Sequence, residues 1–198
     1  MTTAAKRGPG RPRNESTDAA ILAAAVDELI ERGFIAASME SVAARAGVAK
    51  TTLYRRWPSI HELAIAAMET FEQAPDDLPE GSVRDTLVWA LDAMRRKWGN
   101  PRYAAMMRRV AADGTANPAL YRQSRDRLIG PYVRAMNAVI RRGIDEGVLS
   151  ADIDVDWVRG LLVSPIMAAS LTLRDRVTYA QLELTVDTVL RGLSPRAE

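Results

Sequence analysis

The chain has 198 residues, 47% hydrophobic and 26% charged, which is long and apolar enough to bury the core of one or two small domains. With no cysteine and one histidine, it excludes a disulfide framework and a thiolate or imidazole metal site, and we predict no metal and no cofactor. The net charge is only +2, but residues 1–57 hold nine Lys/Arg against six Asp/Glu, so a polyanion is expected to bind at the N-terminal end.

No segment is expected to cross a membrane. The longest uncharged apolar stretch, residues 160–173, is shorter than the roughly 20 residues that a spanning helix needs, and Pro165 interrupts it. Residues 1–13 carry charge and no apolar segment, which argues against a secretory signal. We therefore expect a cytoplasmic protein.

Residues 1–15 are basic, rich in proline and glycine and without periodicity, so we expect a disordered basic arm. The segment Gly10-Arg11-Pro12-Arg13 resembles the centre of an AT-hook, which lies extended in the minor groove of A·T-rich DNA. Arginine is attracted to that narrow groove, which makes Arg11 and Arg13 candidate DNA contacts. A solubilising tail that touches phosphates without sequence preference fits the composition equally well.

The first helix is predicted from about Thr17 to Gly33, with apolar residues at helical spacing on its inner side. Its acidic residues are expected to face water: Asp27, Glu28 and Glu31. This helix is interpreted as a scaffold for the segment that follows it.

Residues 38–57 predict two short helices joined by a tight turn. Gly47 ends the first of them, because glycine accepts the left-handed backbone that such an ending requires. Leu53 and Trp57 point inward from the second helix, whose other faces carry cations and hydroxyl groups. Two such helices describe a helix-turn-helix, the second helix of which enters the major groove of DNA.

The candidate DNA contacts follow from the chemistry of the two grooves and the phosphate backbone. Arginine and lysine pair with guanine edges, and hydroxyl groups and cations bind phosphates. The alternative is a surface helix that is basic by chance, but such a helix would not place a turn glycine and an apolar plug in register. The candidates are Ser38, Arg45, Lys50, Thr51, Thr52, Tyr54, Arg55 and Arg56.

Residues 17–71 resemble the N-terminal domain of the TetR/AcrR family of bacterial transcriptional regulators. The resemblance rests on Gly33-Phe34, Ser38-Met39, Ala46-Gly47-Val48, the run from Lys50 to Trp57, and residues 59–63. Two positions depart from the family pattern and weaken the expected phosphate contacts. Ala49 stands where the family often has a capping serine, and Ile60 where it usually has a phosphate-binding lysine.

The remaining chain predicts further helices. Ser59 and Glu62 form a capping box that opens a helix to about Gln73, with His61 expected at the surface. A Pro/Gly-rich loop then marks a domain boundary. Helical patterns with starting caps at Ser82, Asp154 and Thr178 follow, including a long helix over residues 118–146 with a kink at Gly130-Pro131.

The resemblance implies an all-α fold of about nine helices. A helix-turn-helix domain of three helices would occupy residues 16–73, and a helical domain for ligand binding and dimerisation residues 82–198. It also implies a ligand cavity in the second domain, lined by methionines and aromatic residues that fill irregular space. The same residue types at helical spacing are equally typical of an ordinary core. The candidates are Met94, Trp98, Tyr103, Met106, Met107, Tyr121, Tyr132 and Met136.

The last two predicted helices carry more apolar surface than a body of this size needs. They resemble the helix pair through which many TetR-like proteins form a four-helix bundle between two copies. A homodimer could then read an inverted-repeat operator, since each recognition helix alone makes few base contacts. The candidate interface residues are Leu162, Ile166, Leu182, Val186, Val189 and Leu193.

The sequence therefore predicts a homodimeric regulator, a repressor released from double-stranded DNA by a small, largely apolar effector. Two other classes were compared with it. An enzyme is not expected, because the chain offers no recognisable nucleophile and base and no phosphate loop. A helical adaptor, whose basic end touches acidic partners without reading a sequence, is the remaining alternative.

Overall fold

The structure is a computed structural model that describes residues 15–71, 79–114, 126–172 and 176–195. These residues form nine α-helices with assigned bounds, a further helical stretch at residues 126–128, and no strand, which confirms the all-α prediction. In chain order the helices are α1 (Glu15–Ala36), α2 (Met39–Ala46), α3 (Lys50–Tyr54), α4 (Ile60–Glu69), α5 (Val83–Trp98), α6 (Pro101–Gly114), α8 (Gly130–Asp145), α9 (Val155–Leu171) and α10 (Tyr179–Gly192).

Several of these helices start where a capping side chain was predicted. At α5, for example, the hydroxyl of Ser82 accepts a hydrogen bond from the backbone N–H of Asp85 at 3.1 Å. Such a cap satisfies a backbone donor that would otherwise lack a helical partner, and it contributes about 1 kcal/mol. The predicted caps that the structure confirms are Ser59, Ser82, Asp154 and Thr178.

The long helix predicted over residues 118–146 differs in the structure. The helix α8 begins at Gly130, with Pro131 in its first turn, where a missing N–H costs no hydrogen bond. Residues 126–128 are also helical and Ile129 is not, so the described part of the predicted helix is interrupted directly before the predicted kink, while residues 118–125 lie outside the described residues. Gly147 follows the end of α8 with φ 70°, as the prediction of a terminating glycine requires.

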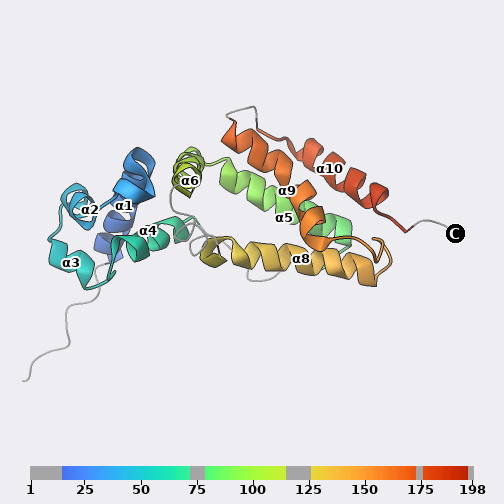
Figure 1. Cartoon of the computed structure of the whole chain (residues 1–198), viewed down its shortest axis with the longest axis horizontal. Coiled ribbons are helices and arrows are strands. Elements are labelled where there is room, and N and C mark those ends of the chain that lie inside the picture. The colour runs from blue at the N-terminus through green and yellow to red at the C-terminus, as the bar shows by residue number, and fades with distance from the viewer. Residues whose placement is uncertain (1–14, 72–78, 115–125, 173–175, 196–198) are drawn as a thin grey trace, which may run out of the picture.

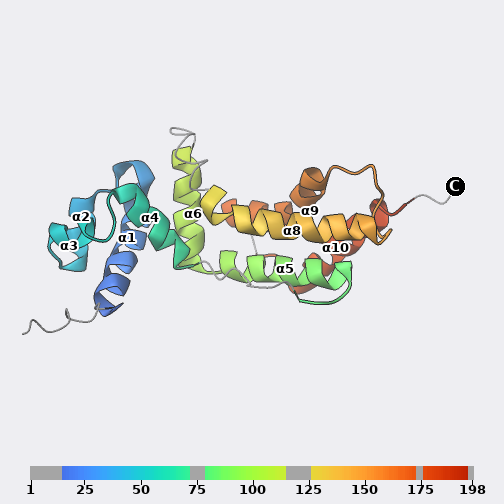
Figure 2. The ribbon, with the colours of Figure 1, turned by 90° about the horizontal axis from the view of Figure 1, so that it is seen from below.

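The helices form two groups, which we call the head (α1–α4) and the body (α5, α6 and α8–α10). In Figure 1 the head lies at one end of the molecule, while α5, α8, α9 and α10 run alongside one another. Figure 2 shows α6 standing across these helices, between them and the head. Because α6 packs against α1, the contact between head and body runs largely through these two helices.

Aliphatic side chains from both groups form one continuous core. In the head, Leu29 of α1, Leu53 of α3 and Leu63 of α4 are all buried in this core, and Leu53 is 0% exposed. In the body, Leu91 and Ile140 are buried as completely. Burying one such side chain contributes about 1.5–3 kcal/mol, so Leu53 contributes substantially to holding α3 on the head. None of the described helices has the length and apolar character needed to span a bilayer.

An ion pair between α5 and α10 makes the stability of the body depend on pH. Arg84 donates from Nε and Nη2 to the two carboxylate oxygens of Asp187, at 2.6 and 3.0 Å. This hydrogen-bonded guanidinium lowers the pKa of Asp187 below its ordinary value. The pair therefore stabilises the fold above about pH 4, and that contribution is lost as the pH falls through the lowered pKa.

We expect Asp187→Asn to lower the midpoint of urea unfolding at pH 7, modestly because both partners are partly exposed and screened by salt. The difference from the unmodified chain should shrink as the pH falls below 4. Asp145→Asn, on the exposed side of α8, is the matched control and should leave the midpoint unchanged. If Asp187→Asn lowers the urea midpoint by the same amount at pH 7 and below pH 4, this role of the ion pair is contradicted.

Candidate DNA-binding surface

The turn between α2 and α3 has the geometry that the glycine pattern predicts. Gly47 adopts φ 67° and ψ 31°, the left-handed conformation, and the N–H of Val48 donates to the carbonyl of Ala43 at 3.1 Å. These contacts close α2 and redirect the chain into α3 within three residues. The two short helices therefore form the predicted helix-turn-helix.

The outer side of α3 is polar and accessible. Lys50, Thr51 and Arg55 are exposed, and the Tyr54 side chain is 50% exposed although Leu53 beside it is fully buried. Thr52 is half-buried. Lys50 donates to Glu40 of α2 at 2.9 Å, a contact that lowers the pKa of that carboxyl group. Hydroxyl, phenol and guanidinium groups thus face solvent together.

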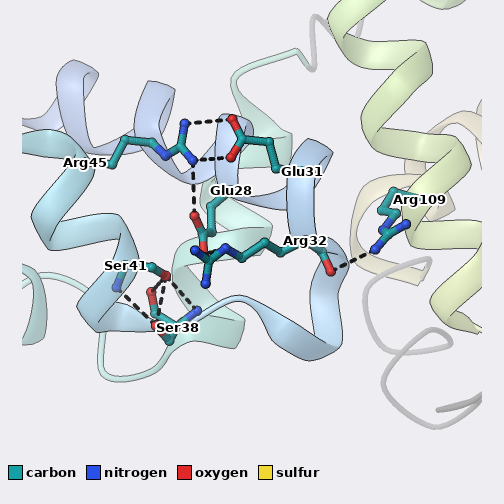
Figure 3. Close-up of polar contacts among 7 residues, drawn as sticks. All are labelled: Glu28, Glu31, Arg32, Ser38, Ser41, Arg45 and Arg109. Atoms are coloured by element: carbon teal, nitrogen blue, oxygen red, sulfur yellow. Dashed lines mark hydrogen bonds and ion pairs between the residues drawn. The ribbon is translucent and has the colours of Figure 1, made fainter.

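At the start of α3, Ala49 occupies the N-cap position and makes no side-chain cap, as its departure from the family pattern predicts. The preceding helix α2, by contrast, has a side-chain cap, which is Ser38. Its hydroxyl accepts from the N–H of Ser41 at 3.1 Å, and the Ser41 hydroxyl accepts from the N–H of Ser38 (Figure 3). The predicted DNA contact Ser38 therefore already holds the beginning of α2.

Two of the predicted arginine contacts are paired with the scaffold helix. Arg45 donates to both carboxylate oxygens of Glu31, with the Nη1–Oε1 bond at 2.9 Å, and it lowers the pKa of that carboxyl group. Arg56 lies 2.7 Å from Asp18 and its side chain is only 18% exposed. Their first role in the structure is to fasten α2 and α3 to α1. Arg11 and Arg13 lie outside the described residues.

Glu28 was predicted to face water, and that prediction is wrong. It is 1% exposed, with one oxygen 3.3 Å from Arg32 and the other 3.6 Å from Arg45 (Figure 3). A buried carboxylate of this kind is tolerated only when cations neutralise it. The spacing of Glu28 and Arg32, four residues apart on one helix, was the available signal for this pairing.

His61 also departs from the prediction of a surface position. Its ring packs edge-on against Phe34, with 5.2 Å between the ring centroids, and both ring nitrogens are buried without a hydrogen-bond partner among the described residues. The residue therefore joins the start of α4 to the end of α1.

The candidate ligand residues converge where α5, α6 and α8 meet. Trp98 packs edge-on against Tyr103 at 5.3 Å, and the ammonium group of Lys97 lies over the rings of Tyr103 and Tyr132, at 4.8 and 4.7 Å. Tyr121 lies outside the described residues. The buried candidates are Trp98, Tyr103, Met106, Met107 and Met136, and the half-buried ones Met94 and Tyr132.

Four of the six candidate interface residues are in the subunit's own core, which corrects the prediction. Leu162, Ile166, Leu182 and Val186 are 0–2% exposed, so no second chain can reach them in this conformation. Val189 and Leu193 are half-buried.

The accessible apolar residues lie on the opposite side of the same two helices. On α9 they recur at helical spacing as Trp157, Leu161 and Leu171, with Ala168 between them, and Leu184 of α10 is 61% exposed. We call this surface the outer stripe and define it as Trp157, Leu161, Ala168, Leu171 and Leu184.

Comparison with known proteins identifies the class. Residues 21–67 match the model of the bacterial regulatory proteins of the tetR family, and residues 75–189 match the tetracyclin repressor-like C-terminal domain. The first match covers the helix-turn-helix and the second covers the body. Together they define a DNA-binding transcriptional regulator and not an enzyme.

The chain belongs to the TetR family. It is 31% identical over 183 residues to the DNA-binding transcriptional repressor TetR of Mycobacteroides abscessus, which covers 90% of this chain and 94% of that protein. It is 30% identical over 189 residues to the HTH-type transcriptional regulator YdeS of Bacillus subtilis, covering 93% of both.

Solved structures share the fold at lower sequence identity. The regulator FadR of Bacillus subtilis, in complex with stearoyl-CoA, gives a TM-score of 0.71 at 17% identity and covers 88% of this chain and 98% of that one. The flavonoid-responsive regulator FrrA gives 0.69 at 22% identity, covering 92% and 100%.

Proposed function

We propose that the chain is a homodimeric repressor that binds an inverted-repeat operator and is released from it by a small, largely apolar effector. Residues 16–73 would form the DNA-binding domain and residues 82–198 the domain for effector binding and dimerisation. A cytoplasmic location fits this role, because the operator is there. The basic arm, residues 1–15, would either enter the minor groove beside the operator or touch phosphates without sequence preference.

The outer stripe is the observation that carries the proposal. Trp157 is 69% exposed and Leu184 61% exposed, and an apolar surface of this kind is costly in water. Both helices already bury their inner sides in the subunit core, so their outer sides are free to pack against a second copy. A twofold axis through this surface would bring the same residues of both subunits together.

A dimer would also increase the number of base contacts that the protein makes through α3. The helix α3 has five residues, about one and a half turns, and it makes few base contacts on its own. Two copies on a twofold axis read two half-sites at once, provided that their spacing matches the helical repeat of about 34–36 Å or a multiple of it. Tyr54 and Arg55 would make the contacts of each half-site, and Lys50, Thr51 and Thr52 would support them.

The effector site is proposed among the aromatic and methionine residues between α5, α6 and α8. Tyr103 contacts Trp98 and Phe71 there, so its ring links the end of α5 to the end of the head. FadR was solved with an acyl-CoA and FrrA is described as flavonoid-responsive, which supports a ligand with a large apolar part. Such a ligand shifts the equilibrium only if it binds the released form more tightly.

Selection of binding sites from a random duplex library by the full-length chain tests the proposal. We expect the recovered pool to contain an inverted repeat with half-site centres about 10–10.5 base pairs apart, or a multiple. Sedimentation of the purified complex should give an even number of chains per duplex. A pool without a common sequence would contradict the proposal and favour the adaptor.

A further inference from the structure

The last turn of α1 is broken at the point where α6 touches it. Gly33 has φ 80° and ψ −179°, a conformation that residues with a side chain rarely adopt. Directly beyond it, the N–H of Phe34 donates to Oδ2 of Asp113 at 2.5 Å. Just before it, the carbonyl of Arg32 accepts from Nη2 of Arg109 at 3.3 Å. The acceptor Asp113 and the donor Arg109 both belong to α6.

The contact leaves no room for another residue at position 33. A Cβ atom on Gly33 would lie 2.9 Å from Nε of Arg109 and closer still to Oδ2 of Asp113. The side chains of Arg109 and Asp113 therefore pack directly against the backbone of Gly33. We call this contact the clamp and define it as Gly33, Phe34, Arg109 and Asp113, with the carbonyl of Arg32.

The clamp is joined to the helix-turn-helix by charged contacts within the head. Arg32, whose carbonyl is held by Arg109, pairs through its side chain with the buried Glu28, and Glu28 also contacts Arg45 of α2 (Figure 3). Arg45 is fixed further by Glu31. Because α2 also packs on α1 and α3 on α2, we expect a movement of α1 to carry α2 and α3 with it, and the pair of Arg56 with Asp18 adds a direct link from α1 to the end of α3.

Further polar contacts support the same side of the head. Arg102, near the start of α6, pairs with Asp27 of α1 at 2.8 Å. Arg127, directly before α8, reaches both Glu62 and Glu69 of α4 at 3.0 and 2.9 Å. The side chains of these ion pairs are partly exposed to solvent, so each pair contributes little to holding the head on the body. The clamp differs from these ion pairs, because Asp113 and Arg109 bind backbone groups of α1, which have no rotamer freedom.

We propose that Asp113 and Arg109 are positioning residues for operator binding: by holding the break of α1 on α6, they fix the orientation of each head on its body. They thereby set the distance between the two recognition helices of the dimer. This inference rests on the proposed homodimer. A displacement of α6 at the effector site would reach α3 through the clamp, since α1, α2 and α3 are tied into one unit.

The first test measures operator affinity as a function of half-site spacing. The selected operator is compared with versions one and two base pairs longer or shorter, and with a single half-site, by fluorescence anisotropy. For Asp113→Ala we expect the preference for the selected spacing to fall at least about tenfold, within the usual range of coupling between sites. Affinity for the single half-site should stay within about twofold of the unmodified chain, because α3 itself is untouched.

Two further variants separate positioning from simple loss of stability. Asp113→Asn keeps an oxygen that can accept from Phe34 and should restore the spacing preference. Asp145→Asn removes an exposed carboxylate of α8, away from the head, and should change nothing. Equal loss of affinity at every spacing in Asp113→Ala, an unchanged spacing preference, or failure of Asp113→Asn to restore it would each overturn the proposal. Should Asp113→Ala not fold, Arg109→Gln takes its place in the same comparison.

A second readout needs no DNA. The chain contains no cysteine, so Ala44→Cys on the exposed side of α2 introduces a single position for a spin label. We expect the label-to-label distance in the dimer to give a distribution at least about twofold broader with Asp113→Ala and unchanged with Asp113→Asn. Unchanged distributions in both would overturn the clamp. A defined distance in a dimer that binds no operator would instead contradict the proposed function while leaving the clamp in place.

Discussion

Arg55→Ala is expected to remove specific binding to the operator while leaving the dimer intact. Arg55 is exposed at the end of α3 and forms no ion pair among the described residues, so its guanidinium is available for a base edge or a phosphate. One such contact is worth about 1–3 kcal/mol, and a dimer loses it twice. The affinity should therefore fall at least about 30-fold, as measured by fluorescence anisotropy with the selected operator.

Arg141→Ala is the matched control, because it removes the same exposed charge from α8 in the body. It should change operator affinity by less than about twofold at moderate salt. Tyr54→Ala should resemble Arg55→Ala, since the phenol is half exposed beside it. Unchanged affinity in both α3 variants would show that another surface of the head reads DNA.

Leu184→Asp is expected to convert the dimer into a monomer. Leu184 is 61% exposed in the single subunit and lies in the outer stripe, so the proposed interface would bury a carboxylate from each chain. Removing an anchoring residue from an interface costs about 2 kcal/mol or more, and symmetry counts it twice. The dimer dissociation constant should rise by at least about three orders of magnitude in sedimentation equilibrium.

Ile35→Asp is the control for this substitution. Ile35 is 57% exposed, nearly as much as Leu184, but it lies at the end of α1 and outside the outer stripe. The dimer should survive it. A chain that stays dimeric with Leu184→Asp, or that dissociates equally with Ile35→Asp, would place the interface elsewhere.

Local sequence patterns predicted the features of this fold that depend on neighbouring residues. Gly47 needs only its own missing side chain to end α2, and the caps at Ser59, Ser82 and Thr178 act within three residues. The burial of Leu53 beneath an exposed Tyr54 likewise follows from helical spacing. These patterns were sufficient to identify the helix-turn-helix and the all-α class.

Contacts between distant residues could not be predicted in the same way. Glu28 reads as a surface residue because its burial depends on Arg45, which arrives from another helix. Asp113 meets Phe34 across 79 residues of sequence. No periodicity within either helix indicates such a pairing.

The choice of interface residues shows a third limit of prediction from sequence. On α9 both sides carry apolar residues, so helical spacing alone gives two possible stripes, one for the subunit's core and one for its surface. The choice of Leu162 over Leu161 selected the inner stripe, which packs on the rest of the body. Only the position of the neighbouring helices distinguishes the two.

The pairing of arginines in the body with carboxylates in the head has an electrostatic consequence for the approach to DNA. Asp27, Glu62 and Glu69 all point toward the body, where Arg102 and Arg127 neutralise them. These pairs reduce the negative potential of the three carboxylates on the side of the head that faces the body. We expect a duplex arriving from solution to be attracted mainly to the side that carries Lys50 and Arg55, and to be oriented before it makes its first contact.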